Sequence, residues 1–229
     1  MFVPLGDDNP LKRIRFQYVT VALIAANILT FLFESSHGSS DALVASFAVV
    51  PQELFQVHFL GGHAPISADQ IPIPERATLF SYMFFHGDIV HLATNMLFLW
   101  VFGDNVEDAM GHVRFLVFYL TCGVAAALTH ALVLPTSQDA LIGASGAVSG
   151  VIAAYLMMHP HVGIWILALK FIPLRITAAV ALGLWILMQI VMVAFPQAGP
   201  TAWWAHIGGL VTGALLILFM RRPGVPLFR

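Results

Sequence analysis

The sequence contains few charged residues. Asp, Glu, Lys and Arg make up only 10% of its 229 residues, whereas a typical soluble domain carries about 25%. Hydrophobic residues make up 59%, more than a soluble fold of this size could bury, because roughly 30% of the surface of its unfolded chain would stay in water. This composition excludes an ordinary soluble domain and a disordered chain. It predicts a polytopic membrane protein in contact with the lipid bilayer.

Cysteine and basic residues are also scarce. Cys122 is the only cysteine, so no disulfide can form within the chain. The ten Lys and Arg residues are outnumbered by twelve Asp and Glu residues, and a nucleic-acid partner would need a basic face. We therefore expect no nucleic-acid partner.

Six apolar segments are candidates for membrane-spanning helices, which need about 20 residues each. They are 17–33, 90–102, 115–134, 145–158, 176–195 and 203–220. We therefore predict an all-α membrane domain of six transmembrane helices over 17–220, between a cytoplasmic segment 1–16 and a cytoplasmic tail 221–229. The first loop, about 35–88, is long and apolar, which indicates a position in the membrane interface. Lys170 and Pro173 interrupt the apolar stretch 164–172, which we interpret as an interfacial connector.

The distribution of Lys and Arg predicts the orientation in the membrane, because these residues favour the inner side. With both termini inside, the outer segments contain only Arg76. The inner segments contain Lys12, Arg13, Arg15, Arg114, Lys170, Arg175, Arg221, Arg222 and Arg229. Residues 17–33 are long and lack a cleavage site, so they favour a retained signal-anchor over a cleaved signal peptide.

Four polar residues lie near the predicted outer ends of the second, fourth and sixth helices: His91, Asn95, Ser145 and His206. Polar groups inside a membrane are costly and suggest function. A structural role remains open for each of them. His91 and Asn95 can form hydrogen bonds between helices, Ser145 can be the N-cap of a helix, and His206 can be a buried histidine whose nitrogens are hydrogen-bonded. No cysteine or carboxylate has metal-ligand spacing near His206, so we expect no metal site.

Glycines surround the serine and follow the histidine. Gly143 and Gly146 allow a tight turn and close backbone approach at Ser145, and N–H groups at a helix start can stabilise an oxyanion.

Two pairs of glycines have the spacing of membrane helix contacts. The pairs are Gly146 with Gly150 and Gly209 with Gly213. Such pairs let two membrane helices approach closely, so packing of the fourth helix on the sixth would bring the serine to the histidine. A histidine within about 3 Å can take the proton of a serine hydroxyl. Because Asp88 and Asp139 are better explained as solvated loop charges, a Ser–His dyad is predicted rather than a triad.

These residues resemble the rhomboid family of intramembrane serine proteases. Residues 143–146 match its GxSG motif, 91–95 match HxxxN, and 205–213 match AHxxGxxxG. The three motifs occur in this order on the second, fourth and sixth predicted helices. The resemblance extends from about Arg76 to Phe219 and includes the segment 102–108.

The resemblance implies a role for each motif residue. Ser145 would be the nucleophile and His206 the general base. Asn95, His91 and the Ser145 N–H would form the oxyanion hole, and Gly143 would shape the turn. Some rhomboids have, four residues after the nucleophile, a tyrosine that stacks on the histidine; this chain has Ser149 there and so departs from that pattern.

The resemblance also implies a reaction and its partners. The substrates would be other transmembrane proteins, cleaved without a cofactor, with the fifth helix and the loop after it admitting them. A non-proteolytic membrane scaffold of the same fold is the alternative, but it is expected to lack the serine or the histidine. The absence of a visible transit peptide predicts a bacterial plasma membrane, with the catalytic site toward the periplasmic or external side. Nothing in the sequence predicts an oligomeric state.

Overall fold

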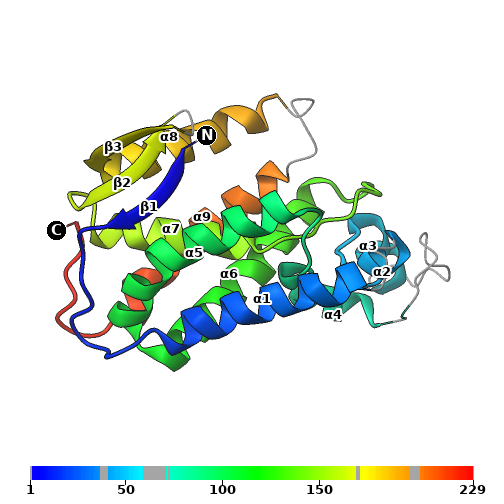
Figure 1. Cartoon of the computed structure of the whole chain (residues 1–229). Helices are drawn as coiled ribbons and strands as arrows, with labels where there is room; N and C mark the ends of the chain where they lie inside the picture. Colours follow the sequence, from blue (N-terminus) through cyan, green and yellow to red (C-terminus); the bar gives the residue numbers. More distant parts are fainter. Residues whose placement is uncertain are drawn as a thin grey trace.

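The computed structural model describes residues 2–36, 41–58, 71, 73–168, 171–195 and 202–228. The protein is mostly helical, and its long helices form a bundle with smaller elements at one end and along one side (Figure 1). The helices are α1 (Tyr18–Ser36), α2 (Asp41–Phe47), α3 (Pro51–His58), α4 (Glu75–Ser81), η1 (Tyr82–Phe84), α5 (Ile89–Met110), α6 (His112–Val133), α7 (Ser145–Met158), α8 (Ala178–Val193) and α9 (Trp203–Met220). The strands are β1 (Val3–Asp7), β2 (Gly163–Ala168) and β3 (Ile172–Thr177).

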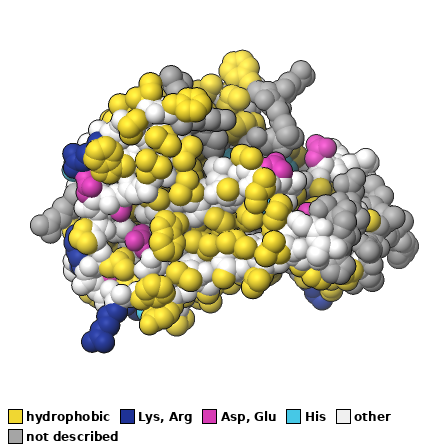
Figure 2. All heavy atoms as spheres, viewed as in Figure 1, with side chains coloured by type: hydrophobic (Ala, Val, Ile, Leu, Met, Phe, Trp, Pro, Cys, Tyr) yellow, Lys and Arg dark blue, Asp and Glu magenta, His cyan; other side chains and the backbone are white. Residues whose placement is uncertain are grey.

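Each of the six predicted apolar segments forms a helix. Among the described residues, α1, α5, α6 and α9 are long and apolar enough to cross a membrane, whereas α7 and α8 are shorter. Hydrophobic side chains cover much of the middle of the molecular face in Figure 2. The protein is therefore a mostly helical membrane protein with four candidate spans, and the six-span count and the cytoplasmic termini stay predictions.

Helix α7 lies in the centre of the bundle. All its residues are buried except Ser145, Leu156 and Met157. Its 14 residues extend only about 21 Å, less than the roughly 30 Å of membrane hydrocarbon. The surrounding helices shield α7 from lipid, so it can begin part of the way into the bundle.

Helix α5 continues beyond the predicted end at residue 102. Its last turns carry two buried carboxylates, Glu107 and Asp108. The Glu107 carboxylate accepts hydrogen bonds from the backbone N–H groups of Val19 and Thr20 at 3.0 and 2.8 Å, and from the Thr20 hydroxyl at 2.7 Å. Glu107 thus satisfies N–H groups in the first turn of α1, which have no partner within that helix. The charged end of α5 is buried because another helix begins against it.

The prediction of an all-α fold is wrong in one region, which forms a three-stranded antiparallel sheet in the order β1-β2-β3. Val3 pairs with Leu167, and Gly163 pairs with Thr177. Strand β1 lies within the predicted N-terminal segment 1–16, while β2 and the start of β3 replace the predicted connector. The sheet lies beside α5 and α8 (Figure 1). An open sheet edge is unfavourable in hydrocarbon, and the interfacial position of this region stays a prediction.

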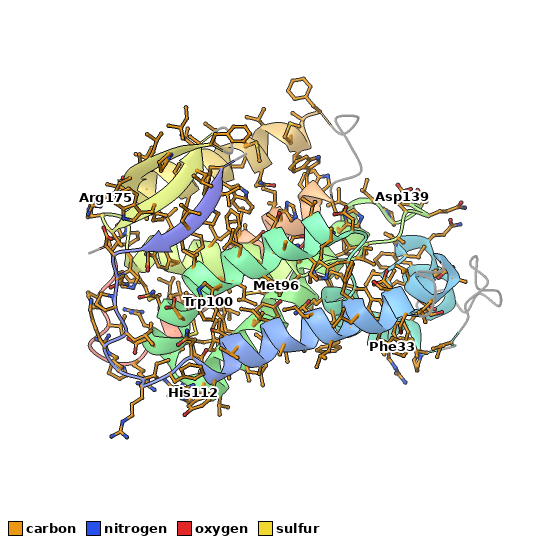
Figure 3. The ribbon with its side chains drawn as sticks, viewed as in Figure 1. Phe33, Met96, Trp100, His112, Asp139 and Arg175 are labelled. Atoms are coloured by element: carbon orange, nitrogen blue, oxygen red, sulfur yellow. The ribbon has the colours of Figure 1, made fainter. Side chains whose placement is uncertain are left out.

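The described part of the long first loop, 41–58, 71 and 73–88, contains α2, α3, α4 and η1. These elements lie at the opposite end of the bundle from the sheet (Figure 1). An isolated bridge between Val49 and Leu141 joins this region to the segment before α7. Asp139 lies at this same end, whereas His112 and Arg175 lie toward the other end (Figure 3). The loop therefore builds one wall around the start of α7.

Candidate active site

Ser145 is the first residue of α7 and follows a turn that requires glycine. Gly143 has a φ of +113°, in the region that favours glycine. A Cβ atom on Gly143 would lie 2.6 Å from Cε1 of His91. The N-cap position belongs to Ala144, with no side-chain cap hydrogen bond. The alternative that Ser145 acts as the helix N-cap is therefore wrong.

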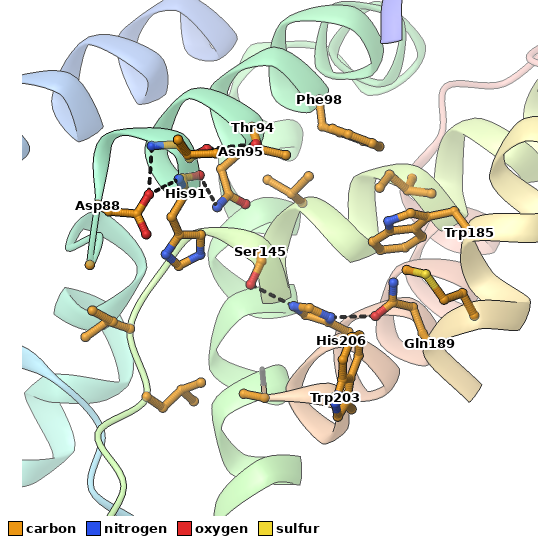
Figure 4. Close-up of a pocket in the computed structure, with 18 of the residues that line it drawn as sticks. Asp88, His91, Thr94, Asn95, Phe98, Ser145, Trp185, Gln189, Trp203 and His206 are labelled. Carbon is orange, nitrogen blue, oxygen red and sulfur yellow. Dashed lines mark hydrogen bonds between the residues drawn. The ribbon is translucent and has the colours of Figure 1, made fainter. Parts of the chain in front are cut away.

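His206 lies in the first turn of α9 and faces Ser145 (Figure 4). Its Nε2 atom lies 2.8 Å from the Ser145 Oγ, and its Nδ1 atom lies 2.7 Å from the Gln189 Oε1. The Trp203 and Trp185 rings flank the imidazole, with centroid distances of 6.0 and 6.2 Å. His206 is only 8% exposed. The imidazole therefore has a hydrogen-bond partner at each nitrogen.

Ser149, which stands where some rhomboids have tyrosine, does not hold the histidine. Its hydroxyl donates a hydrogen bond of 2.6 Å to the backbone carbonyl of Ser145, one turn earlier in α7. Trp203, the first residue of α9, contacts the His206 ring. Tryptophan and Gln189 side chains thus surround the histidine in this chain.

Glycines allow the close approach of α7 and α9. A Cβ atom on Gly209 would lie 2.9 Å from the carbonyl carbon of Gly146 and even closer to its oxygen. A Cβ atom on Gly213 would lie 2.5 Å from the Cα of Gly150. Gly146 and Gly150 also contact α6, where their added Cβ atoms would meet Ala126 and Cys122. The backbones of α7 and α9 are therefore in contact, with small side chains of α6 packed against them, and this crossing begins next to Ser145 and His206.

His91 and Asn95 project from the first turns of α5 toward the same space (Figure 4). The Asn95 side-chain amide donates a hydrogen bond of 3.0 Å to the His91 backbone carbonyl. Both residues line the cavity that contains Ser145 and His206. The structure therefore brings all four sequence-predicted polar residues to one cavity, although among their side chains only those of Ser145 and His206 are hydrogen-bonded to each other.

Asp88 and His86, both in the segment before α5, support the start of this helix and the turn that precedes Ser145. Asp88, which we interpreted as a solvated loop charge, is the N-cap of α5 and accepts from the N–H groups of Val90 and His91 at 2.7 and 2.8 Å. The hydrogen bond from the His91 N–H holds the pKa of Asp88 below its ordinary value. The Nε2 of buried His86 accepts from the Ala144 N–H at 3.4 Å. Burial, together with the neighbouring His91, lowers the pKa of His86 to about 4, so this histidine is neutral at pH 7.

The site opens into a cavity of about 610 Å³ between α5, α7, α8 and α9. Its walls are largely apolar and include Phe98, Ile152, Trp185 and Met188. Ser145 and His206 lie between His91 on one side and Gln189 on the other (Figure 4). In the parts of the chain that the structure describes, no group of three or more His, Cys, Asp or Glu side chains could hold a metal ion. The arrangement offers a nucleophile beside a base, facing an apolar cavity.

Sequence reasoning missed Gln189 and His86. Gln189 is the only amide in the otherwise apolar helix α8, and a polar residue in a membrane helix is a recognised signal of function. His86 lies five residues before His91, where its contact with Ala144 depends on how two distant segments pack. The first residue could have been found from the sequence, whereas the second could not.

Comparison with known proteins identifies related chains. The family model described as the Rhomboid domain matches residues 74–223. Among the relatives is "Rhomboid protein 1, mitochondrial" of Saccharomyces cerevisiae, 28% identical over 153 residues that cover 62% of this chain and 41% of that protein. "RHOMBOID-like protein 4" of Arabidopsis thaliana is 32% identical over 150 residues, which cover 63% of this chain and 34% of that protein. "Presenilin-associated rhomboid-like protein A, mitochondrial" of Danio rerio is 29% identical over 143 residues, which cover 58% of this chain and 35% of that protein.

The matched segments span less than half the length of these relatives. The relatives also overturn the predicted location in a bacterial plasma membrane, because they are eukaryotic and several are named mitochondrial. They point instead to an organellar membrane. The prediction had relied on the lack of a transit peptide, which a chain covering only part of its relatives cannot test.

Proposed function

The chain belongs to the rhomboid family, and from that premise we propose that it is an intramembrane serine endopeptidase that uses Ser145 and His206. The observation that carries this proposal is the distance of 2.8 Å between the Ser145 Oγ and the His206 Nε2. A serine hydroxyl is a weak nucleophile until a neighbouring base takes its proton. This distance lies within the range required for such a transfer.

In the proposed reaction, His206 Nε2 takes the hydroxyl proton while Ser145 Oγ attacks the carbonyl carbon of the scissile peptide. The carbonyl oxygen becomes an oxyanion, which the Ser145 N–H and the side chains of Asn95 and His91 would stabilise by hydrogen bonds. Asn95 would have to turn its amide from the His91 carbonyl, its present partner. His206 then donates the proton to the leaving amine, and the bond between carbon and nitrogen breaks. Water, activated by the same histidine, releases the acyl group from Ser145.

The cavity suggests the class of substrate. Its apolar walls would accept apolar side chains, and the site lies among helices that are themselves apolar enough for a membrane. A transmembrane segment of another protein has this chemistry. Because a helix hides its carbonyls in hydrogen bonds, such a segment must unwind locally before Ser145 can reach one of them.

The proposal is tested with a fluorophosphonate probe, which labels an activated serine, and with cleavage of a transmembrane substrate after reconstitution in lipid. We expect wild type to react and Ser145→Ala and His206→Ala to lose both labelling and cleavage while still inserting. Ser149→Ala is the matched control, because it removes a serine hydroxyl one turn further along α7 and should keep most of the reactivity. An inserted wild-type protein that neither labels nor cleaves would support the scaffold function instead.

A further inference from the structure

Gln189 is a buried amide in a helix with no other polar side chain. It is the last residue on the buried face of α8, which also contains Ala178, Leu182 and Trp185. Gln189 is only 1% exposed, whereas its neighbour Ile190 is 55% exposed. Burying an amide among apolar groups is costly unless it forms hydrogen bonds. A residue of this kind is therefore expected to have a specific partner.

The partner of the Gln189 carbonyl oxygen is the Nδ1 atom of His206, at 2.7 Å. An oxygen can only accept, so this contact is a hydrogen bond only when Nδ1 carries the proton. In the neutral imidazole, that tautomer leaves Nε2 with a free lone pair. The Nε2 atom is the one that lies 2.8 Å from Ser145 Oγ. The oxygen of Gln189 thus selects the tautomer in which the histidine can accept the serine proton.

The same contact also restrains the orientation of the ring. The Trp203 and Trp185 rings lie beside the imidazole, but apolar contacts do not distinguish its two nitrogens. Ser145 and Gln189 bind opposite sides of the ring (Figure 4). Without Gln189, the imidazole could exchange tautomers or rotate away from the serine.

We propose that Gln189 is a positioning residue that completes a hydrogen-bonded series Ser145–His206–Gln189, with the neutral amide in the place that an aspartate occupies in soluble serine proteases. This inference rests on the proposed function. A neutral amide suits a site among apolar helices, because a carboxylate there would carry a larger desolvation cost. The role assigned to Gln189 also explains how His206 is held in a chain that has Ser149 instead of a stacking tyrosine.

Two substitutions distinguish positioning from packing. Gln189→Met keeps the length and the apolar contacts but removes the acceptor, whereas Gln189→Glu keeps an acceptor and adds a charge. If Gln189 only fills space, the methionine variant should be the more active, because it avoids a buried charge. If Gln189 positions the histidine, the glutamate variant should be the more active. The two readings therefore predict opposite orders of activity.

We expect Gln189→Met to lower the rate of probe labelling and the kcat of cleavage by about tenfold, the upper range for one neutral hydrogen bond. We expect Gln189→Glu to keep activity near wild type at alkaline pH. As the pH is lowered, this variant should lose activity at a pH about one unit higher than the wild type does. The reason is that a carboxylate beside the ring favours the protonated imidazolium, which cannot act as base. Ile190→Met, on the exposed side of α8, is the matched control and should leave rate and profile unchanged.

The experiment uses the full chain reconstituted in lipid, with wild type and Ser145→Ala measured in parallel. A reactive wild type with Gln189→Met at wild-type rates and a Gln189→Glu profile that does not shift would overturn the role of Gln189 and leave the protease proposal intact. A wild type that neither labels nor cleaves would overturn both. Loss of activity in both variants, with unchanged thermal stability, would also contradict the positioning role, since the retained acceptor would then have failed to rescue.

Discussion

Replacing Gly209 by alanine is expected to separate α7 from α9 and to disable the Ser145–His206 pair. Gly209 follows His206 by three residues, about 4.5 Å along the helix axis. Its added Cβ atom would lie 2.9 Å from the carbonyl carbon of Gly146 and nearer still to the oxygen. Both of these atoms belong to the backbone of α7, so no side chain can move aside. The helices themselves must move.

The size of this movement follows from the contact distances. Carbon atoms in favourable contact lie about 3.5 Å or more apart, so the carbonyl carbon of Gly146 must retreat by roughly 0.6 Å and its oxygen by more. A separation of about 1 Å lengthens the 2.8 Å Ser145–His206 contact to nearly 4 Å, beyond hydrogen-bond range. Misplacement of catalytic groups by about 1 Å can cost about 100-fold in rate, which corresponds to about 2.7 kcal/mol.

The assay is the rate of fluorophosphonate labelling of Gly209→Ala in lipid, together with its thermal unfolding. Gly183→Ala is the matched control, because it adds the same methyl group to the apolar helix α8, where nothing lies within 4 Å of the new atom. We expect the Gly209 variant to label about 100-fold more slowly and the Gly183 variant to match wild type. Wild-type labelling by Gly209→Ala would refute the argument that this glycine contact sets the distance between serine and histidine.

Two further predictions concern stability. Glu107→Ala should lower the free energy of unfolding by about 3 kcal/mol, since it leaves two N–H groups at the start of α1 without their carboxylate partner. Denaturant titration in detergent measures this change, and an unchanged midpoint of unfolding would contradict the prediction. His86 should make the fold less stable as the pH falls from about 6.5 to about 4, because its pKa is about 4 in the folded protein against 6.5 when exposed, so the unfolded chain binds more protons in this range. His86→Gln keeps an acceptor for the Ala144 N–H without titrating, and its unfolding curves should depend less on pH than those of wild type; equal dependence would remove His86 as the cause.

Local patterns in the sequence predicted the helices because hydrophobicity and helix ends are properties of short segments. The predicted segments 145–158 and 203–220 coincide with α7 and α9. The prediction for α5 stopped at residue 102 because charged residues follow, although Glu107 and Asp108 are buried at the far end of this helix. Their burial depends on α1, whose first turn supplies the hydrogen-bond donors. A contact between helices cannot be read from one of them alone.

The sheet escaped prediction for a similar reason. Strand β1 pairs with β2 although the two are far apart in the sequence, as Val3 and Leu167 are. The apolar run 164–172 is too short for a span, and its alternation of buried Ile164 and Ile166 with exposed Trp165 becomes meaningful only beside a partner strand. Neither segment contains a sign that points to the other. Residues predicted as a connector and as an N-terminal segment thus form one sheet through nonlocal pairing.

The sequence by itself determined that this is an apolar, mostly helical membrane protein, because composition and hydrophobic periodicity are properties of single segments, and its motifs carry the resemblance to the rhomboid family. The same motifs singled out Ser145 and His206 as candidates. Tertiary structure alone decided the surroundings of the histidine: the amide of Gln189 at Nδ1 and tryptophans on its sides. These neighbours come partly from α8, whose position depends on packing against the bundle rather than on any pattern near His206. The low charge of the chain indicated a membrane, and the packing of its helices brings the few polar groups together.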